Sequence, residues 1–460
     1  MKGTMKRAEI EKIAERCGHS CYLFDADEAR EEIRRMREIL PERVSVCYSM
    51  KANPFLTGEL AEAADDIEVC SFGELAICRR LHIPPEKIVL SGVNKGREDL
   101  LRVLQEYGNR ITYTAESLAQ WEILDGWALE HQVNLSVLPR LTNGSQFGMD
   151  REEIESILAQ QAQRRRAWEQ EEGVFDLSPS EPGAMPHGRM KTTPARAGAE
   201  VSGIHFFAGT QKKNMKRDED ELLMLDECLS GWKEAFGFVP ERLEYGPGMS
   251  VDYYGSEQAD RQKEEQDLWA LFAALSSMKY QGRVVLEFGR RIAASCGTYV
   301  TEVAEVKQRR MEDGTVNHFA IVGGGIHQIT YYGQMMGMKI PPVYVLEQAG
   351  GGNERAAGVL PAGAGSSSAG EDDRMRWSVF GSLCSMNDVL LRDVPLGELH
   401  AGDHLVFGRC GAYSPTEGIA LFLSRDLPAV FLYDRSRGAR LVRRNTPADS
   451  WNTPQEITED

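Results

Sequence analysis

The feature that most constrains the fold of this chain is an alternation of short β-branched or apolar runs with segments of helical patterning. Ser117–His131 has the apolar spacing of an amphipathic helix, and Phe55–Asp65 is rich in Ala, Leu and Glu. Strands that alternate with helices pair in parallel, and eight such units predict a (β/α)8 barrel of the TIM type. The eight predicted strands are Val44–Met50, Glu68–Phe72, Ile88–Gly92, Ile111–Ala115, Leu135–Leu141, Val201–Phe207, Arg242–Gly246 and Val284–Gly289.

The chain changes character after the eighth predicted strand. Short apolar runs continue, but Gly, Pro and Asp turns now separate them, which is typical of an antiparallel sheet. We therefore expect a barrel over residues 25–290 and a second, mostly antiparallel β domain over residues 291–435. Residues 1–24 are assigned to the second domain, because Ser20–Phe24 is a compact apolar run that suits the same sheet.

Three segments are poor in large apolar residues. Residues 164–200 carry three consecutive arginines and then many Pro, Gly and Ser, and residues 349–373 are dense in Gly, Ala and Ser. Such compositions bury too little apolar surface to offset the entropy lost on ordering. We predict a flexible insertion in each domain and a mobile tail over residues 436–460.

The charge and hydropathy of the chain exclude several kinds of partner. Asp and Glu total 70 against 53 Lys and Arg, which gives a formal net charge of −17 and leaves no basic stripe to neutralise nucleic-acid phosphates. No apolar run approaches the roughly 20 residues of a membrane-spanning helix. The charged N-terminus is not followed by the apolar core of a signal peptide. We predict a cytoplasmic protein that binds neither nucleic acid nor membrane.

The nine cysteines are scattered along the chain. Only Cys17 and Cys21 are close in sequence, and no second pair lies nearby to complete a metal site. We therefore expect neither a metal centre nor a disulfide framework, and interpret most cysteines as small core residues.

Lys51 lies at the end of the first predicted strand, in the run Tyr48–Asn53. A lysine there is partly desolvated, which lowers the pKa of its amine and leaves the amine free to attack a carbonyl. The alternative interpretation is an exposed strand-end lysine without a chemical role.

Glu287 and Arg290 occupy the equivalent place, at the end of the eighth predicted strand. They can form a structural ion pair, or the carboxylate can keep a ring nitrogen protonated while the guanidinium binds a phosphate. Two turns, Gly209–Gln211 and Gly246–Gly248, follow other strands and can bring backbone N–H groups to phosphate oxygens. Together with Lys51, they supply the amine, the pyridine partner and the phosphate cradle that pyridoxal 5′-phosphate (PLP) requires.

These features resemble the fold-type III PLP decarboxylases, the group that contains diaminopimelate and ornithine decarboxylases. The resemblance extends over roughly residues 20 to 435. It implies a TIM-like barrel with an alanine-racemase-like C-terminal β-barrel, and PLP-dependent decarboxylation of an amino acid. The matching features are Tyr48–Asn53, Val69–Leu75, Gly203–Gln211, Gly246–Gly248, Glu287–Arg290, Cys384–Asp388 and Gly411–Tyr413.

The resemblance also implies a role for each matching residue. Lys51 is similar to the family's Schiff-base lysine, and Glu287 to the glutamate that faces the pyridine nitrogen. Cys384 is similar to the cysteine that a neighbouring subunit inserts into the active site, near the carbon that is reprotonated. Lys51 and Cys384 are therefore the expected catalytic residues, in a homodimer with two shared sites. The expected cofactor-binding residues are Lys51, His205, Phe207, Thr210, Gly246, Gly248, Glu287, Gly289, Arg290 and Tyr413.

Two departures from the family concern the substrate. Ser385 stands where diaminopimelate decarboxylases carry a glutamate that holds the substrate's distal ammonium. The stretch Gly323–Gln328 lacks both the usual aspartate and an arginine to grip the distal carboxylate. Because discrimination between substrates depends on such buried polar partners, diaminopimelate is not the expected substrate.

Phe207 is a third departure, because family members usually carry a histidine there, stacked on the cofactor ring. Phenylalanine keeps an apolar face but cannot exchange a proton, while His205 lies on the same side of the strand. The overall pattern is closer to decarboxylases of biosynthetic clusters, some of which act on an aminoacyl group tethered to a carrier protein. His327, Ser385 and Asp388 are the candidate substrate-binding residues, with a structural histidine as the alternative for His327.

Two other functions remain open. An amino-acid racemase shares the barrel and the lysine, but racemases pair the pyridine nitrogen with arginine, where this chain has Glu287. A catalytically inactive regulatory homologue is the second alternative, and the presence of both Lys51 and Cys384 argues against it.

Overall fold

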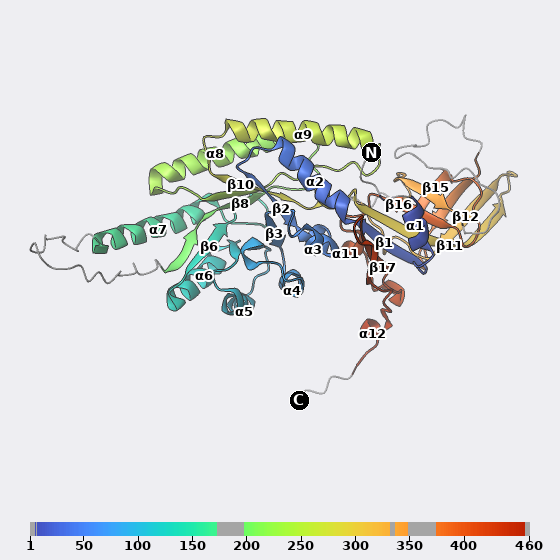
Figure 1. Cartoon of the computed structure of the whole chain (residues 1–460), viewed down its shortest axis with the longest axis horizontal. Coiled ribbons are helices and arrows are strands. Elements are labelled where there is room, and N and C mark those ends of the chain that lie inside the picture. The colour runs from blue at the N-terminus through green and yellow to red at the C-terminus, as the bar shows by residue number, and fades with distance from the viewer. Residues whose placement is uncertain (1–4, 6, 173–196, 332–335, 348–373, 456–460) are drawn as a thin grey trace, which may run out of the picture.

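The computed structural model describes residues 5, 7–172, 197–331, 336–347 and 374–455. Their strands form two separate sheets that lie end to end, with the short helix α11 (Ser414–Glu417) at the junction (Figure 1). The predicted insertion at 349–373 lies outside the described residues. Among the helices that the structure describes, none has the length and apolar character needed to cross a membrane.

The first sheet is a nearly closed barrel of nine parallel strands in the order β7-β6-β5-β4-β3-β2-β10-β9-β8. Its two edges meet where Leu141 N donates to His205 O at 2.9 Å. The sixth predicted strand is two strands, because the chain breaks at Ser202: the first part pairs with β6 and the second with β9. The strands are β2 (Val44–Ser49), β3 (Asp66–Val69), β4 (Ile88–Leu90), β5 (Thr112–Ala115), β6 (Asn134–Pro139), β7 (Gly198–Val201), β8 (Gly203–Phe207), β9 (Arg242–Gly246) and β10 (Arg283–Phe288).

Helices cover the outside of the barrel, as the alternation of patterns predicts (Figure 1). Several begin at a side chain that accepts hydrogen bonds from the free backbone N–H groups of the first turn. Asp25 accepts from Asp27 and Glu28, and Ser117 accepts from Gln120. The main helices are α2 (Ala26–Ile39), α4 (Phe72–Arg80), α5 (Arg97–Tyr107), α6 (Leu118–His131), α7 (Arg151–Glu172), α8 (Lys216–Phe236) and α9 (Glu257–Ser277).

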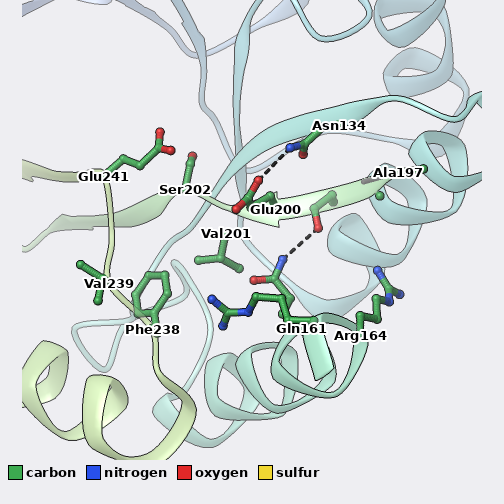
Figure 2. A pocket seen from close by; sticks show the side chains of 13 residues that line it. Asn134, Gln161, Arg164, Ala197, Glu200, Val201, Ser202, Phe238, Val239 and Glu241 are labelled. Atoms are coloured by element: carbon green, nitrogen blue, oxygen red, sulfur yellow. Dashed lines mark hydrogen bonds between the residues drawn. The ribbon is translucent and has the colours of Figure 1, made fainter. Parts of the chain in front are cut away.

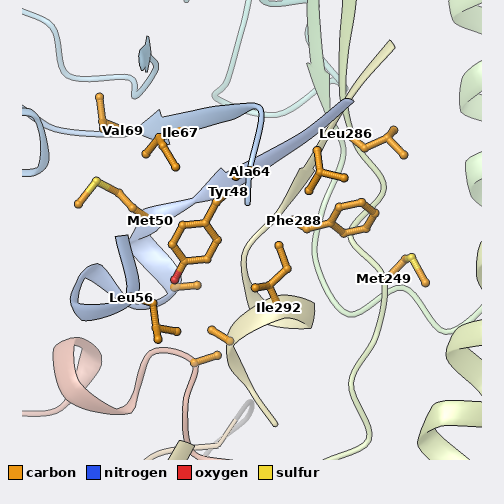
Figure 3. Close-up of a cluster of buried hydrophobic side chains, with 14 of the residues drawn as sticks. Tyr48, Met50, Leu56, Ala64, Ile67, Val69, Met249, Leu286, Phe288 and Ile292 are labelled. Carbon is orange, nitrogen blue, oxygen red and sulfur yellow. The ribbon is translucent and has the colours of Figure 1, made fainter. Parts of the chain in front are cut away.

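The barrel strands alternate between two environments. On their outer faces, Tyr48, Ile67 and Phe288 contribute to a buried apolar cluster (Figure 3). The residues adjacent to Ile67 and Phe288 on these strands, Glu68 and Glu287, are buried carboxylates. The lumen therefore holds ionisable groups that the apolar outer layer separates from solvent.

The second sheet is mostly antiparallel and also has nine strands. The N-terminal strand lies inside this sheet, paired antiparallel with β11 and parallel with β17. The strands are β1 (Ser20–Asp25), β11 (Gly297–Arg310), β12 (Val316–Val322), β13 (Val343–Leu346), β14 (Arg376–Phe380), β15 (Val389–Pro395), β16 (His404–Gly408), β17 (Ala429–Asp434) and β18 (Gly438–Arg443).

Part of the predicted disorder is wrong. Residues 164–172 continue helix α7, where Arg164 pairs with Asp125 at 2.5 Å, because Gln, Arg, Ala and Glu are good helix formers. In the predicted tail, β18 pairs with β17 and the short helix α12 (Asp449–Asn452) follows. Residues 173–196 and 456–460 lie outside the described part of the chain.

The interpretation of the cysteines as small core residues misses one bonded pair, because Cys17 and Cys21 form a disulfide with each other. Helix α1 (Arg7–Ala14) ends just before Cys17, and Cys21 lies in β1. The short turn between them places the two Cα atoms 5.3 Å apart, within the range that a disulfide spans.

Candidate active site

Lys51 lies in the turn that follows β2, at the carboxyl end of the barrel. Its amine donates to both oxygens of Glu68, at 2.8 and 3.1 Å, and lies 3.4 Å from the Cys70 sulfur. Burial favours the neutral amine, but the Glu68 carboxylate overcomes this effect and raises the pKa of Lys51 well above its ordinary value. The expectation of a lowered pKa is therefore wrong for Lys51, because the sequence does not reveal this ion pair.

Glu287 lies on β10, which pairs directly with β2, so the acid and the amine lie at the same end of the barrel. Burial, and then the charge of Glu68, raise the pKa of Glu287 to about 7. Its Oε1 lies 2.9 Å from Nε2 of His205. Burial and the charge of Arg140 lower the pKa of His205 to about 4. The His205 imidazole that contacts Glu287 is therefore neutral. Among the described residues, no charged Lys or Arg side chain contacts the Glu287 carboxylate directly.

Phe207 covers the approach to the amine, with its ring centroid 5.9 Å from Lys51 Nζ. Gly246 makes this position available, since a Cβ there would collide with the Phe207 ring. Gly248 has a φ of +62°, and a Cβ on it would collide with the carbonyl oxygen of Gly209. The two predicted glycine turns therefore lie against each other, as a cradle of close backbone segments.

Arg290 lies directly after β10, at the start of the short helix α10 (Arg290–Ala293). Its guanidinium stands 4.4 Å from the Tyr413 ring centroid, and Nη1 donates to the Tyr253 hydroxyl at 2.8 Å. Tyr413 N donates to Ala52 O at 2.7 Å, which ties this aromatic residue to the Lys51 turn. Gly289 lets the backbone after β10 pack closely against the Lys51 turn, because a Cβ on Gly289 would lie 3.0 Å from Ala52 Cβ. Thr210 is exposed at the end of the Gly209 turn.

Four predicted residues belong to the β domain rather than to this cluster. Cys384 and Ser385 are exposed in the loop between β14 and β15. Asp388 is buried and accepts hydrogen bonds from Ile326 N at 2.8 Å and Leu383 N at 2.7 Å, so it fixes this loop rather than facing solvent. His327 is buried, and neither ring nitrogen has a hydrogen-bond partner among the described residues. Within one chain, no hydrogen bond among the described residues joins this loop to Lys51.

Sequence reasoning missed Glu68 and Lys95. Glu68 was interpreted only as the start of a strand, although an acid inside the apolar run Ile67–Val69 is the same signal that singled out Glu287. Lys95 is buried beside Thr114 at 3.3 Å, and burial lowers its pKa to about 8. No local pattern marks Lys95, because its burial comes from the barrel closing around it.

A separate cavity of about 100 Å³ lies at the amino-terminal ends of β6 and β9, the opposite end of the barrel from Lys51 (Figure 2). Asn134 donates to Glu200 at 2.7 Å and Gln161 donates to Ala199 O at 2.9 Å on its wall. It contains none of the predicted site residues.

Comparison with known families decides the assignment. The family model described as "Pyridoxal-dependent decarboxylase, C-terminal sheet domain" matches residues 21–411. The chain belongs to the pyridoxal-dependent decarboxylases. This decarboxylase is 24% identical to the L-glutamyl-[BtrI acyl-carrier protein] decarboxylase of Niallia circulans, over 99% of this chain and 98% of that protein. It is 22% identical to the diaminopimelate decarboxylase of Aquifex aeolicus, over 88% and 84% of the two chains.

Solved structures show the same fold. The diaminopimelate decarboxylase of Helicobacter pylori, complexed with L-lysine, superimposes with a TM-score of 0.69 at 18% identity and covers 96% of this chain and 98% of its own. The lysine/ornithine decarboxylase of Vibrio vulnificus, complexed with putrescine, gives 0.69 at 18% identity, over 94% and 99%. The predicted barrel with a second β domain, the PLP cofactor and amino-acid decarboxylation are therefore confirmed for this enzyme.

The residues at the barrel end fit PLP. Glu287 is a buried acid whose ionised form needs a cation, which a protonated pyridine nitrogen provides. The glycine cradle brings backbone close together without side chains, and Arg290 offers a guanidinium for a phosphate. Lys51 would supply the amine that binds the aldehyde.

Glu68→Gln is expected to make the cofactor-free enzyme take up PLP faster at neutral pH. The carboxylate raises the pKa of Lys51, so its removal lowers that pKa and increases the fraction of free amine. The pH midpoint of uptake should therefore move to lower pH. The rise of cofactor absorbance after mixing, followed across pH, measures it.

Glu116→Gln is the matched control, because Glu116 pairs with Arg140 at 2.9 Å and makes no hydrogen bond to Lys51. It should leave the midpoint in place. An unchanged midpoint in Glu68→Gln would show that Glu68 does not set the protonation of Lys51.

Proposed function

We propose that this enzyme decarboxylates an aminoacyl group tethered to a carrier protein. The observation that carries the proposal is the similarity to a carrier-linked glutamyl decarboxylase over nearly the full length of both chains. The residues that would hold the far end of free diaminopimelate are also missing. Ser385 is an exposed serine, and Asp388 fills the space beside Gly325 and Gly381, where a Cβ on either glycine would meet its carboxylate.

The barrel-end cluster suits a division of roles around the cofactor. Lys51 would bind it covalently, Arg290 and Tyr413 would hold its phosphate with the glycine cradle, and Phe207 would cover the ring. Glu287, supported by neutral His205, would keep a proton on the ring nitrogen. Bound PLP supplies the electron sink for loss of carbon dioxide.

Cys384 supports a proposal of a homodimer with shared active sites. Its thiol is exposed, and the neighbouring Met386 is 93% exposed, at a loop whose base Asp388 holds rigid. An apolar tip on a rigid loop is suited to insertion into another subunit. There Cys384, or the freed Lys51, would return the proton to the substrate carbon after carbon dioxide leaves.

The substrate proposal predicts that carrier-loaded aminoacyl groups release carbon dioxide with a kcat/KM at least roughly a hundredfold above that of the same free amino acids. Released carbon dioxide and the mass of the carrier-bound product are the measurements. Lys51→Ala with the loaded carrier controls for spontaneous loss. A free amino acid that reacts as well as its loaded form would refute a tethered substrate.

A further inference from the structure

A groove of about 750 Å³ crosses the β domain. One wall is formed by β12 and the bulge in β11 at Ala304, and the other by the segment Leu423–Asp426. Asn445 and Ser382 also line it. This volume is within the range of sites that enclose small organic ligands.

The groove ends beside the loop that carries Cys384. Ser382, two residues before that cysteine, accepts a hydrogen bond from Arg425 Nε at 3.1 Å and donates its N–H to Gly324 O at 2.7 Å. Ser382 therefore connects the lining of the groove to the cysteine loop.

The chemistry of the lining is mixed. Ile321, Val322 and Leu423 supply apolar surface, while Ser382, Ser424 and Asn445 supply uncharged polar groups. The charged side chains are Arg425 and Asp426, and the His19 imidazole lies 3.4 Å from Glu302. Such a surface suits a slender ligand made of short apolar segments and amides, with at most one anionic group.

The outer border of the groove is apolar and strained. Leu423 and Ser424 have φ values of +58° and +49°, a left-handed conformation that is rare for such residues. Leu421, Phe422 and Leu423 are all more than two-fifths exposed, and Asn452 donates to Leu421 O at 2.9 Å. A strained backbone that keeps apolar side chains exposed to solvent is typical of a site that contacts another molecule.

We propose that this groove binds the phosphopantetheine-type arm of the carrier protein, a linear chain with two amides, a thioester at one end and a phosphodiester at the other. The inference rests on the proposed function and adds a site for the tether. The thioester end would lie at the Cys384 loop, and the exposed Leu421–Leu423 tip would meet the carrier itself. In the proposed dimer, the arm would thereby reach the active site that this loop completes.

Ala304→Trp tests the groove, because Ala304 is an exposed residue at a β-bulge on its wall. The substrates are two thioesters of the same amino acid, one on phosphopantetheine and one on N-acetylcysteamine, which lacks most of the arm. The variant should raise KM for the long thioester by roughly tenfold or more and leave the short one unchanged. Titration calorimetry with phosphopantetheine alone should show binding to the native enzyme and its loss in the variant.

Val316→Trp is the matched control, since Val316 is 41% exposed at the far end of β12; it should change neither KM. Arg425→Gln gives a second, smaller perturbation, expected to weaken phosphopantetheine binding. If loaded carrier is decarboxylated but Ala304→Trp and Arg425→Gln change neither KM nor binding, the groove proposal is overturned while the proposed function stands. If no thioester is decarboxylated by the native enzyme, both fall.

Discussion

Lys51→Ala is expected to abolish the bound-cofactor absorbance and to lower kcat by at least about a thousandfold. Lys51 is the amine that lies at the same end of the barrel as Glu287, beneath the Phe207 ring and beside the turn tied to Tyr413. Without it, the cofactor loses its covalent attachment and the site loses one of its two candidate proton donors. Absorbance of the purified enzyme and carbon dioxide release measure the two effects.

Lys95→Ala is the control that makes this test decisive. By pKa alone, Lys95 is the better nucleophile, since burial lowers its pKa to about 8 while Glu68 holds that of Lys51 high. However, the Lys95 amine is enclosed by Gly92 O and the Thr114 hydroxyl. Lys95→Ala should keep the cofactor absorbance. If Lys95→Ala loses it and Lys51→Ala keeps it, the assignment of the amine is wrong.

The contrast between these two lysines shows what the sequence can predict. Lys51 and Glu287 are visible because each breaks an apolar run at a strand end, and parallel strands bring their carboxyl ends to one rim. Their common location follows from local pattern and topology together. The pKa of Lys51 cannot be predicted in the same way, because its ion pair with Glu68 depends on the side-chain positions of neighbouring strands.

The remaining errors have the same origin. The break at Ser202 that divides β7 from β8 comes from the closure of the barrel, since one part pairs with β6 and the other with β9. Residues 438–443 form the ordered strand β18 because they pair with β17, whereas their composition alone predicts a mobile tail. The substrate-binding role of Asp388 stays a prediction, and the sequence does not reveal that its carboxylate accepts from two backbone N–H groups that the fold brings to it.

Mixing two inactive variants is expected to restore activity if the active sites are shared. Lys51→Ala leaves Cys384 intact, and Cys384→Ala leaves Lys51 intact, so a heterodimer contains one complete site and one with both defects. Random reassortment of equal amounts makes half of the molecules heterodimers. Activity should therefore return to about a quarter of that of the native enzyme, measured as carbon dioxide release after dissociation and reassociation.

Lys51→Ala mixed with Glu287→Gln is the matched negative control. Both residues come from the paired strands β2 and β10 of a single chain, so no arrangement of these two subunits yields a complete site. Only the mixture of Lys51→Ala with Cys384→Ala should recover activity. Of the three substituted residues, Cys384 is the one exposed on a loop that can reach a partner subunit. No recovery in the first mixture, despite heterodimers seen by native mass spectrometry, would mean that each chain completes its own site.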